Sequence, residues 1–232
     1  MSDWGKVFFA VRCGHSADAL FLQCWTKFCL VGVREGDVVS APMSELPQHY
    51  AADALALGFL ESRCDSIMYI DDDMIFQPAD VHALRDDPEG AAYDGLMGLC
   101  LSRSGVHHPI VMQPNEGGGF NIINKPEPDT IIDVGIVGLG FTLIRRSAFE
   151  RVDQVRKNKE MYFQWGPKGD SEDAGFCEMA VKTGCRFGVS SRVCIGHRIK
   201  TVVVWNAEAQ TVEYKEKARN PKKMFMGRDN HE

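Results

Sequence analysis

Residues 66–76 read SIMYIDDDMIF and carry the strongest indication of the fold. The stretch begins with a short, mostly apolar run, which is typical of a buried strand. Three aspartates, Asp71, Asp72 and Asp73, follow it at once. In open α/β sheets, ligands bind at the carboxyl ends of the strands. The stretch therefore predicts a strand that delivers carboxylates to a binding crevice.

Three neighbouring carboxylates repel one another, by on the order of several kcal/mol per pair where they are partly buried. A divalent cation would neutralise them, and hard oxygen ligands suit Mg²⁺ or Mn²⁺. Extended backbone would turn Asp71 and Asp73 to one side and Asp72 to the other. The alternative interpretation of the same residues is a solvated acidic turn before a helix near Pro78.

Strand and helix signals alternate around this stretch. Apolar runs and helical spacing predict a strand over 6–11 and helices over 17–30, 46–63 and 78–85. Ser16 is expected to cap the first helix, and residues 29–33 to begin a second strand. Such alternation predicts an α/β fold with a mostly parallel central sheet flanked by helices.

The carboxyl-terminal half is expected to continue in the same way. Strands are expected at 93–100, 131–134, 138–144, 186–189 and 192–195, and helices at 147–156 and 171–182. Residues 102–130, which include Gly117–Gly119, are expected to form a long loop of the kind that is usually functional or disordered. We expect one domain over 1–204 and a basic tail over 205–232.

Composition narrows the function classes. The chain has 232 residues and a formal net charge of −6, which suits one domain and argues against a general nucleic-acid binder. The sequence holds no apolar run long enough for a membrane span and no signal-peptide pattern at its start, which predicts a cytoplasmic protein. None of the eight cysteines forms a CxxC pair, so neither structural zinc nor a disulfide framework is expected.

Two later segments add to the aspartate stretch. Gly138 and Gly140 lie near the start of an expected strand, where glycine leaves room for a ligand to approach the backbone. Glu172 and Asp173 open an expected helix, and His197 follows the last expected strand. Each feature has a plain structural alternative, namely a strand bulge, acids that complement a helix dipole, and a surface histidine.

Taken in this order, the segments resemble a glycosyltransferase of the GT-A fold, close to the family 2 type seen in bacteria and phages. The resemblance spans roughly residues 6–200 and is carried by DDD, by GLGF with LIRR after it, by SEDAGFC and by Gly196-His197. It implies a Rossmann-like nucleotide-diphospho-sugar transferase fold, with a nucleotide-binding half over about 1–100 and an acceptor and catalytic half over about 101–204. It also implies a nucleotide-sugar donor, usually a UDP-sugar, a glycan or other hydroxyl acceptor, and Mn²⁺ or Mg²⁺.

The resemblance also implies roles for single residues. Asp71, Asp73 and His197 would hold the metal, and Asp72 would lie near the ribose or the donor sugar. Asp173 would be the catalytic base, with Glu172 supporting it or contacting the acceptor. Further donor contacts are expected from Val11 and Arg12 at the end of the first strand, Asp37 at the nucleobase, Gly138, Gly140, and Arg198 and Lys200 at the diphosphate.

The implied chemistry is physically consistent. A metal neutralises the charge that develops on a diphosphate leaving group, and one carboxylate takes the proton of the acceptor hydroxyl. One base without a second nucleophile fits inversion by direct displacement.

Two alternatives stay open, which are another metal-dependent phosphoryl-chemistry enzyme (a nucleotidyltransferase or phosphatase) and a non-catalytic sugar-nucleotide or glycan binder. The missing DxDxT, GxGxxG and GxxxxGK[ST] motifs argue against the first, and Asp173 argues against the second.

Overall fold

The computed structural model describes residues 4–14, 17–42, 45–102, 108–115, 120–157, 160–165 and 171–198, and the backbone of two strands at 201–206 and 211–216. The chain divides into two compact units, Met1–His197 and Arg198–Glu232. The expected extent of the first domain, to residue 204, and its division into two halves near residue 100 stay predictions.

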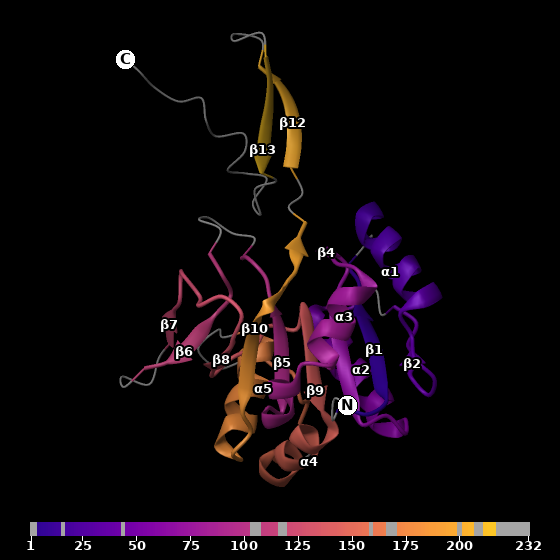
Figure 1. Cartoon of the computed structure of the whole chain (residues 1–232), viewed down its shortest axis with the longest axis vertical. Helices are drawn as coiled ribbons and strands as arrows, with labels where there is room; N and C mark the ends of the chain where they lie inside the picture. The colour runs from indigo at the N-terminus through magenta and orange to yellow at the C-terminus, as the bar shows by residue number, and fades with distance from the viewer. Residues whose placement is uncertain are drawn as a thin grey trace. The chain divides into compact units, whose positions relative to one another are not determined.

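A seven-stranded sheet forms the centre of the first unit, with the strand order β2-β1-β3-β9-β5-β10-β8 (Figure 1). Its strands are β1 (Val7–Arg12), β2 (Val38–Val39), β3 (Ser66–Asp71), β5 (Gly95–Leu99), β8 (Ile131–Val134), β9 (Phe141–Arg145) and β10 (Phe187–Cys194). β1 pairs in parallel with β2 and β3, and β5 pairs in parallel with β10. β9 and β8 run antiparallel to their neighbours. The other five strands share one direction, so the sheet is mainly parallel, as the sequence predicts.

Helices cover both faces of this sheet (Figure 1). They are α1 (Ala19–Val31), α2 (Gln48–Glu61), α3 (Pro78–Arg85), α4 (Arg146–Val155) and α5 (Glu172–Lys182), with a short 3₁₀ helix, η1 (Pro88–Ala92). α2, α4 and α5 pack on one face through Phe59, Phe149 and Phe176. α1 and α3 pack on the other face through Phe28 and Leu84. Within the described ranges, none of the helices has the length and hydropathy needed to cross a membrane.

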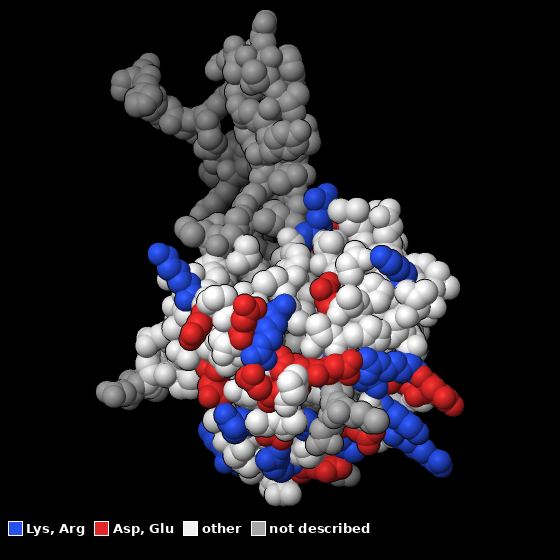
Figure 2. Space-filling view, viewed as in Figure 1, with Lys and Arg blue, Asp and Glu red and all other residues white. Residues whose placement is uncertain are grey.

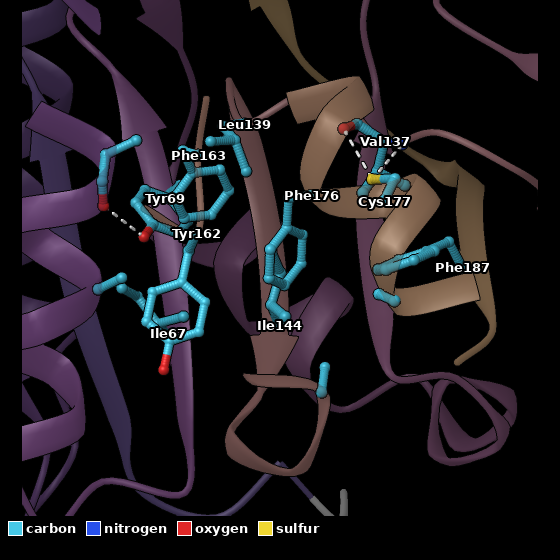
Figure 3. Close-up of a cluster of buried hydrophobic side chains, with 14 of the residues drawn as sticks. Ile67, Tyr69, Val137, Leu139, Ile144, Tyr162, Phe163, Phe176, Cys177 and Phe187 are labelled. Carbon is cyan, nitrogen blue, oxygen red and sulfur yellow. Dashed lines mark hydrogen bonds between the residues drawn. The ribbon is translucent and has the colours of Figure 1, made fainter. Parts of the chain in front are cut away.

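Strand β3 explains why an unbroken apolar run precedes the aspartates. Ile67 and Tyr69 point into the core under α2, α4 and α5, whereas Met68 and Ile70 point into the opposite core. A strand covered on both faces needs apolar side chains at every position. Figure 3 shows Tyr69 beside Phe163, and its hydroxyl donates a hydrogen bond to the Ala52 carbonyl at 2.9 Å.

Short strand pairs complete the described fold. β4 (Met74–Ile75) pairs with β11 (Gly196–His197), and β6 (Met112–Pro114) pairs with β7 (Phe120–Ile122). In the second unit, β12 (Thr201–Asn206) pairs with β13 (Thr211–Glu216). The β4–β11 pair sets His197 opposite Met74, the residue that follows the three aspartates.

The start and end of the first helix differ from the sequence prediction. α1 continues to Val31, and β2 begins only at Val38, so no strand occupies residues 29–33. The helix is capped by Asp18, whose side chain accepts a hydrogen bond from the Leu20 amide at 2.9 Å. Ser16, the expected cap, lies outside the described residues.

Two predictions in the second half also need correction. The strands expected at 186–189 and 192–195 are one strand, β10, because its pairing with β5 resumes after a shift in register between Ser190 and Cys194. The stretch 102–130 is not a plain loop, since the β6–β7 hairpin lies within it. Gly117–Gly119 lie outside the described residues.

Charges of opposite sign are mixed on the surface. On the face in Figure 2, acidic and basic side chains are interspersed among uncharged ones. One such exposed pair joins Arg186 to Asp133 at 3.0 Å. Exposed pairs of this kind contribute about 0–1 kcal/mol each, so the fold depends mainly on the two buried apolar cores.

Candidate active site

Arg12 and Asp71 lie side by side at the carboxyl edge of the sheet. They are register partners at the ends of the parallel strands β1 and β3. The Arg12 Nε atom donates to Asp71 Oδ1 at 2.8 Å, and Nη2 donates to Oδ2 at 3.0 Å. The two side chains are only 7% and 16% exposed. A buried two-point contact of this kind is strong and fixes the orientation of both groups.

Arg12 also reaches the start of α5. Its Nη1 atom donates to Glu172 Oε1 at 3.0 Å, and both side chains are buried. Burial lowers the pKa of Arg12, but the carboxylates of Asp71, Glu172 and Asp173 more than offset this, so the pKa lies above its ordinary value. The guanidinium therefore keeps its charge and neutralises part of the acidic edge.

Asp72 organises the loop that follows β1. Its Oδ2 accepts hydrogen bonds from the Gly14 amide at 2.8 Å and from Cys13 Sγ at 3.4 Å. Its own amide donates to the Arg12 carbonyl at 3.1 Å. The middle aspartate therefore ties the ends of β1 and β3 together, while its neighbours turn to other partners.

Asp73 faces His197 across the β4–β11 pair. The His197 Nε2 atom lies 3.5 Å from Asp73 Oδ1, and the two side chains are 8% and 7% exposed. Nδ1 of the same imidazole lies 2.7 Å from the Leu101 carbonyl oxygen. Since that oxygen only accepts, Nδ1 carries a proton, and Nε2 is the ring nitrogen that faces Asp73.

A divalent cation fits this pair. Two neighbouring atoms bound to an octahedral Mg²⁺ at about 2.1 Å each lie about 3 Å apart, so the observed 3.5 Å needs only a small approach of the two side chains. The described residues give the buried His197 Nε2 atom no hydrogen-bond partner. A proton on the far nitrogen held by a backbone carbonyl is also the usual arrangement of a metal-binding histidine.

The expected ligand set of Asp71, Asp73 and His197 is not assembled. Among the described residues, no three acidic, histidine or cysteine side chains gather where they could hold one ion. Asp71 is turned to Arg12 instead. Mg²⁺ commonly takes one or two carboxylates together with substrate phosphates, so a metal beside a diphosphate does not require three protein ligands.

Asp173 has the environment of a proton acceptor. Burial raises its pKa above the ordinary value, and the nearby Glu172 carboxylate adds to this, whereas hydrogen bonds from Ser171 and Ala174 and the Arg12 charge oppose it. Its Oδ1 accepts from the Ser171 hydroxyl and, at 2.9 Å, from the Ala174 amide. A carboxyl group tuned in this way is a common feature of catalytic sites.

Gly138 and Gly140 flank the acidic edge from the segment that leads into β9. A Cβ atom on Gly138 would lie 3.5 Å from Asp173 Oδ2, an ordinary contact, so there is room beside that acid. A Cβ atom on Gly140 would meet Met74 Cε at 2.8 Å, with Asp71 Oδ2 at 3.6 Å, so Met74 fills the space there.

Solved structures resemble the fold of this chain. Protein A197 from STIV is 16% identical, with a TM-score of 0.55, over 91% of this chain and 94% of A197. GalNAc-T7, whose crystal structure contains UDP, GalNAc and Mn²⁺, is 9% identical, with a TM-score of 0.55, over 84% of this chain and 43% of GalNAc-T7. The chain has the GT-A fold. At these identities the likeness concerns the fold alone, and neither a family model nor a curated protein matches the sequence.

Two expected donor contacts have other roles in this GT-A fold. The Val11 side chain is fully buried in the core, so it has no exposed surface for a ligand. Asp37 accepts from Arg85 Nη1 at 2.8 Å and from the Val7 amide at 2.9 Å, with its side chain 0% exposed. A carboxylate satisfied from inside the fold has no oxygen left for a nucleobase, so we leave Asp37 out of the donor site.

The remaining basic candidates lie beyond the first unit. Arg198 begins the second unit and is exposed, and Lys200 lies outside the described residues. Their expected contacts with a diphosphate stay predictions.

Three contributors to the site escape sequence reasoning. The Leu101 carbonyl orients His197 from far along the chain, and no local pattern marks it. The pairing of Arg12 with Glu172 likewise joins distant segments. Ser171 could have been found, because serine before an acidic helix start is a capping signal. Its hydroxyl contacts the Asp173 carboxylate.

Proposed function

We propose that this protein is a metal-dependent glycosyltransferase that moves a sugar from a nucleotide-sugar donor, most simply a UDP-sugar, to an acceptor hydroxyl with inversion. The observation that carries the proposal is the contact between Asp73 Oδ1 and His197 Nε2, 3.5 Å apart at the edge where β3 ends. In the GT-A fold this edge is where the strand ends meet a ligand.

Asp73 and His197 would hold Mn²⁺ or Mg²⁺. When bound, such an ion neutralises charge on a diphosphate leaving group. Gly138 leaves room beside Asp173 for the donor to approach the backbone, and Gly140 is proposed to contact the donor once the Met74 side chain moves. Asp72, which holds the loop after β1, is proposed to shape the ribose or donor-sugar side through that loop.

Asp173 is proposed to accept the proton of the acceptor hydroxyl. Its raised pKa makes it a stronger base than an exposed aspartate, and it lies on α5, whereas Asp73 precedes β4 and His197 lies in β11. A base separate from the metal pair supports direct displacement and hence inversion. Glu172 supports it indirectly, through Arg12.

A screen of UDP-sugars with Mn²⁺, read out as release of nucleoside diphosphate, tests this function. Release that depends on Mn²⁺ and is lost in Asp173→Asn supports it. Release of inorganic phosphate from a phosphomonoester would instead identify the phosphatase alternative. Tight UDP binding with no turnover of any donor would identify a non-catalytic binder. Membership of family 2 and a cytoplasmic location stay predictions of the sequence.

A further inference from the structure

Arg12 contacts both acidic parts of the site. Its guanidinium holds Asp71, at the end of β3, by two hydrogen bonds of 2.8 and 3.0 Å. The same group holds Glu172, the first residue of α5, at 3.0 Å. Segments far apart in the sequence are therefore joined through one buried cation.

Arg12 supplies the positive charge between two acids of the site. Asp71 and Glu172 both share its guanidinium. A guanidinium cannot lose its proton in a protein, so this positive charge is permanent. Between these two acids the guanidinium stands where a cation would otherwise be needed.

We infer that Arg12 is a positioning residue that takes the place of a cation between Asp71 and Glu172 and fixes the start of α5 that carries Asp173. This inference rests on the proposed function for the roles of the metal and the base. Its charge component stands on the contacts alone.

The same molecule offers a matched control. Arg85 pairs with Asp37, and these side chains are likewise buried, 7% and 0% exposed. Backbone groups of Val7 and Gly5 complete the hydrogen bonds of this pair. The pair lies at the start of β1, whereas the acidic edge lies at its end. Arg85→Met and Arg12→Met each remove a buried guanidinium that holds an aspartate. Arg12→Met affects Asp71 and Glu172, which belong to the site, whereas Arg85→Met affects Asp37, which does not.

Thermal unfolding with Mn²⁺ alone tests the charge role without any donor. Arg12→Met removes the guanidinium between Asp71 and Glu172, so we expect Mn²⁺ to raise its Tm by several degrees more than it raises that of wild type. Arg85→Met should show the wild-type shift from its own lower starting Tm. Equal Mn²⁺ shifts in Arg12→Met and Arg85→Met would overturn the inference.

The conservative variant Arg12→Lys tests positioning and covers the case in which Arg12→Met does not fold. Lysine keeps the charge but cannot hold two groups in a fixed fork. Since a displacement of about 1 Å can lower turnover about 100-fold, we expect kcat to fall by about that factor, with the donor KM within about threefold of wild type. A raised donor KM at unchanged kcat would show that Arg12 binds the donor directly, and would overturn the inference.

The two readouts separate this inference from the proposed function. If wild type turns over no UDP-sugar but Arg12→Met gains the extra Mn²⁺ shift, the glycosyltransferase proposal fails and the cation role of Arg12 stands. If wild type turns over a donor and Arg12→Lys matches it in kcat and KM, the function stands and the inference fails.

Discussion

Nε2 of His197 lies 3.5 Å from Oδ1 of Asp73, with both side chains buried, although the two residues are far apart in the sequence. The short β4–β11 pair brings them together. The Leu101 carbonyl accepts the Nδ1 proton, so that Nε2 is the nitrogen that faces the carboxylate. This contact is the strongest support for a cation at the sheet edge.

Replacing the histidine tests the metal pair. His197→Ala removes one of two protein ligands, so UDP with Mn²⁺ should stabilise the variant far less than wild type. A ligand at about 100 times its Kd stabilises by about 2.7 kcal/mol, and we expect most of that shift to vanish. Thermal unfolding with and without EDTA measures it. His108→Ala is a matched control, because the His108 Nδ1 atom also contacts a backbone carbonyl, at 3.0 Å. A His197→Ala variant with the full shift would contradict the assignment.

The base assignment predicts a loss of turnover without a loss of binding. Asp173→Asn keeps the size of the side chain but cannot take a proton, so turnover of a UDP-sugar should fall by about 10²- to 10⁴-fold. The UDP–Mn²⁺ thermal shift should stay unchanged. Glu178→Gln, an exposed position on the same helix, serves as the control. Retained turnover in Asp173→Asn would remove Asp173 from the mechanism.

The raised pKa of Asp173 predicts two effects of pH. A base must be ionised, so the acidic limb of kcat/KM should have an apparent pKa above the ordinary value of 3.8. Between that value and the raised one, the folded state binds more protons than the unfolded chain, so this group lowers stability as pH rises. Urea unfolding from about pH 4 to about pH 6 should show a smaller contribution of this kind in Asp173→Asn. An acidic limb at or below 3.8 would contradict the burial of the base.

The Asp37–Arg85 pair should matter for stability rather than for ligand binding. Breaking a buried ion pair by removing one partner destabilises by about 3–5 kcal/mol, and Asp37 is 0% exposed. Asp37→Ala should therefore unfold at lower urea concentration, with the UDP–Mn²⁺ shift of the folded protein unchanged. A specific loss of uridine binding, with normal stability, would restore Asp37 to the donor site.

Gly138 should tolerate a methyl group in the fold but not in the reaction. An added Cβ would meet Asp173 Oδ2 at 3.5 Å, an ordinary contact, so Gly138→Ala should change the free energy of unfolding by less than about 1 kcal/mol. The methyl group would occupy space beside the base, and we expect turnover to fall about tenfold or more. Gly58→Ala, whose Cβ would meet Phe8 at 3.7 Å away from the acids, is the comparison. Equal turnover in the two variants would leave Gly138 a purely structural residue.

Local patterns in the sequence determined the fold class and the position of the acids. The apolar run of β3 and the acidic start of α5 can be recognised without the structure. A strand buried on both faces has a continuous run of apolar residues, and a helix has apolar residues at a spacing of three to four. The alternating strands and helices likewise predicted a mainly parallel sheet. Helix α3, expected over 78–85, begins and ends where the sequence predicts.

Tertiary structure alone decided which charges meet. Asp71 and Asp73 are near neighbours in sequence, yet one is held by Arg12 and the other faces His197. Asp37 turned out to be an internal partner of Arg85. Each of these choices depends on strand register and on contacts between distant segments, and a linear pattern carries no record of either.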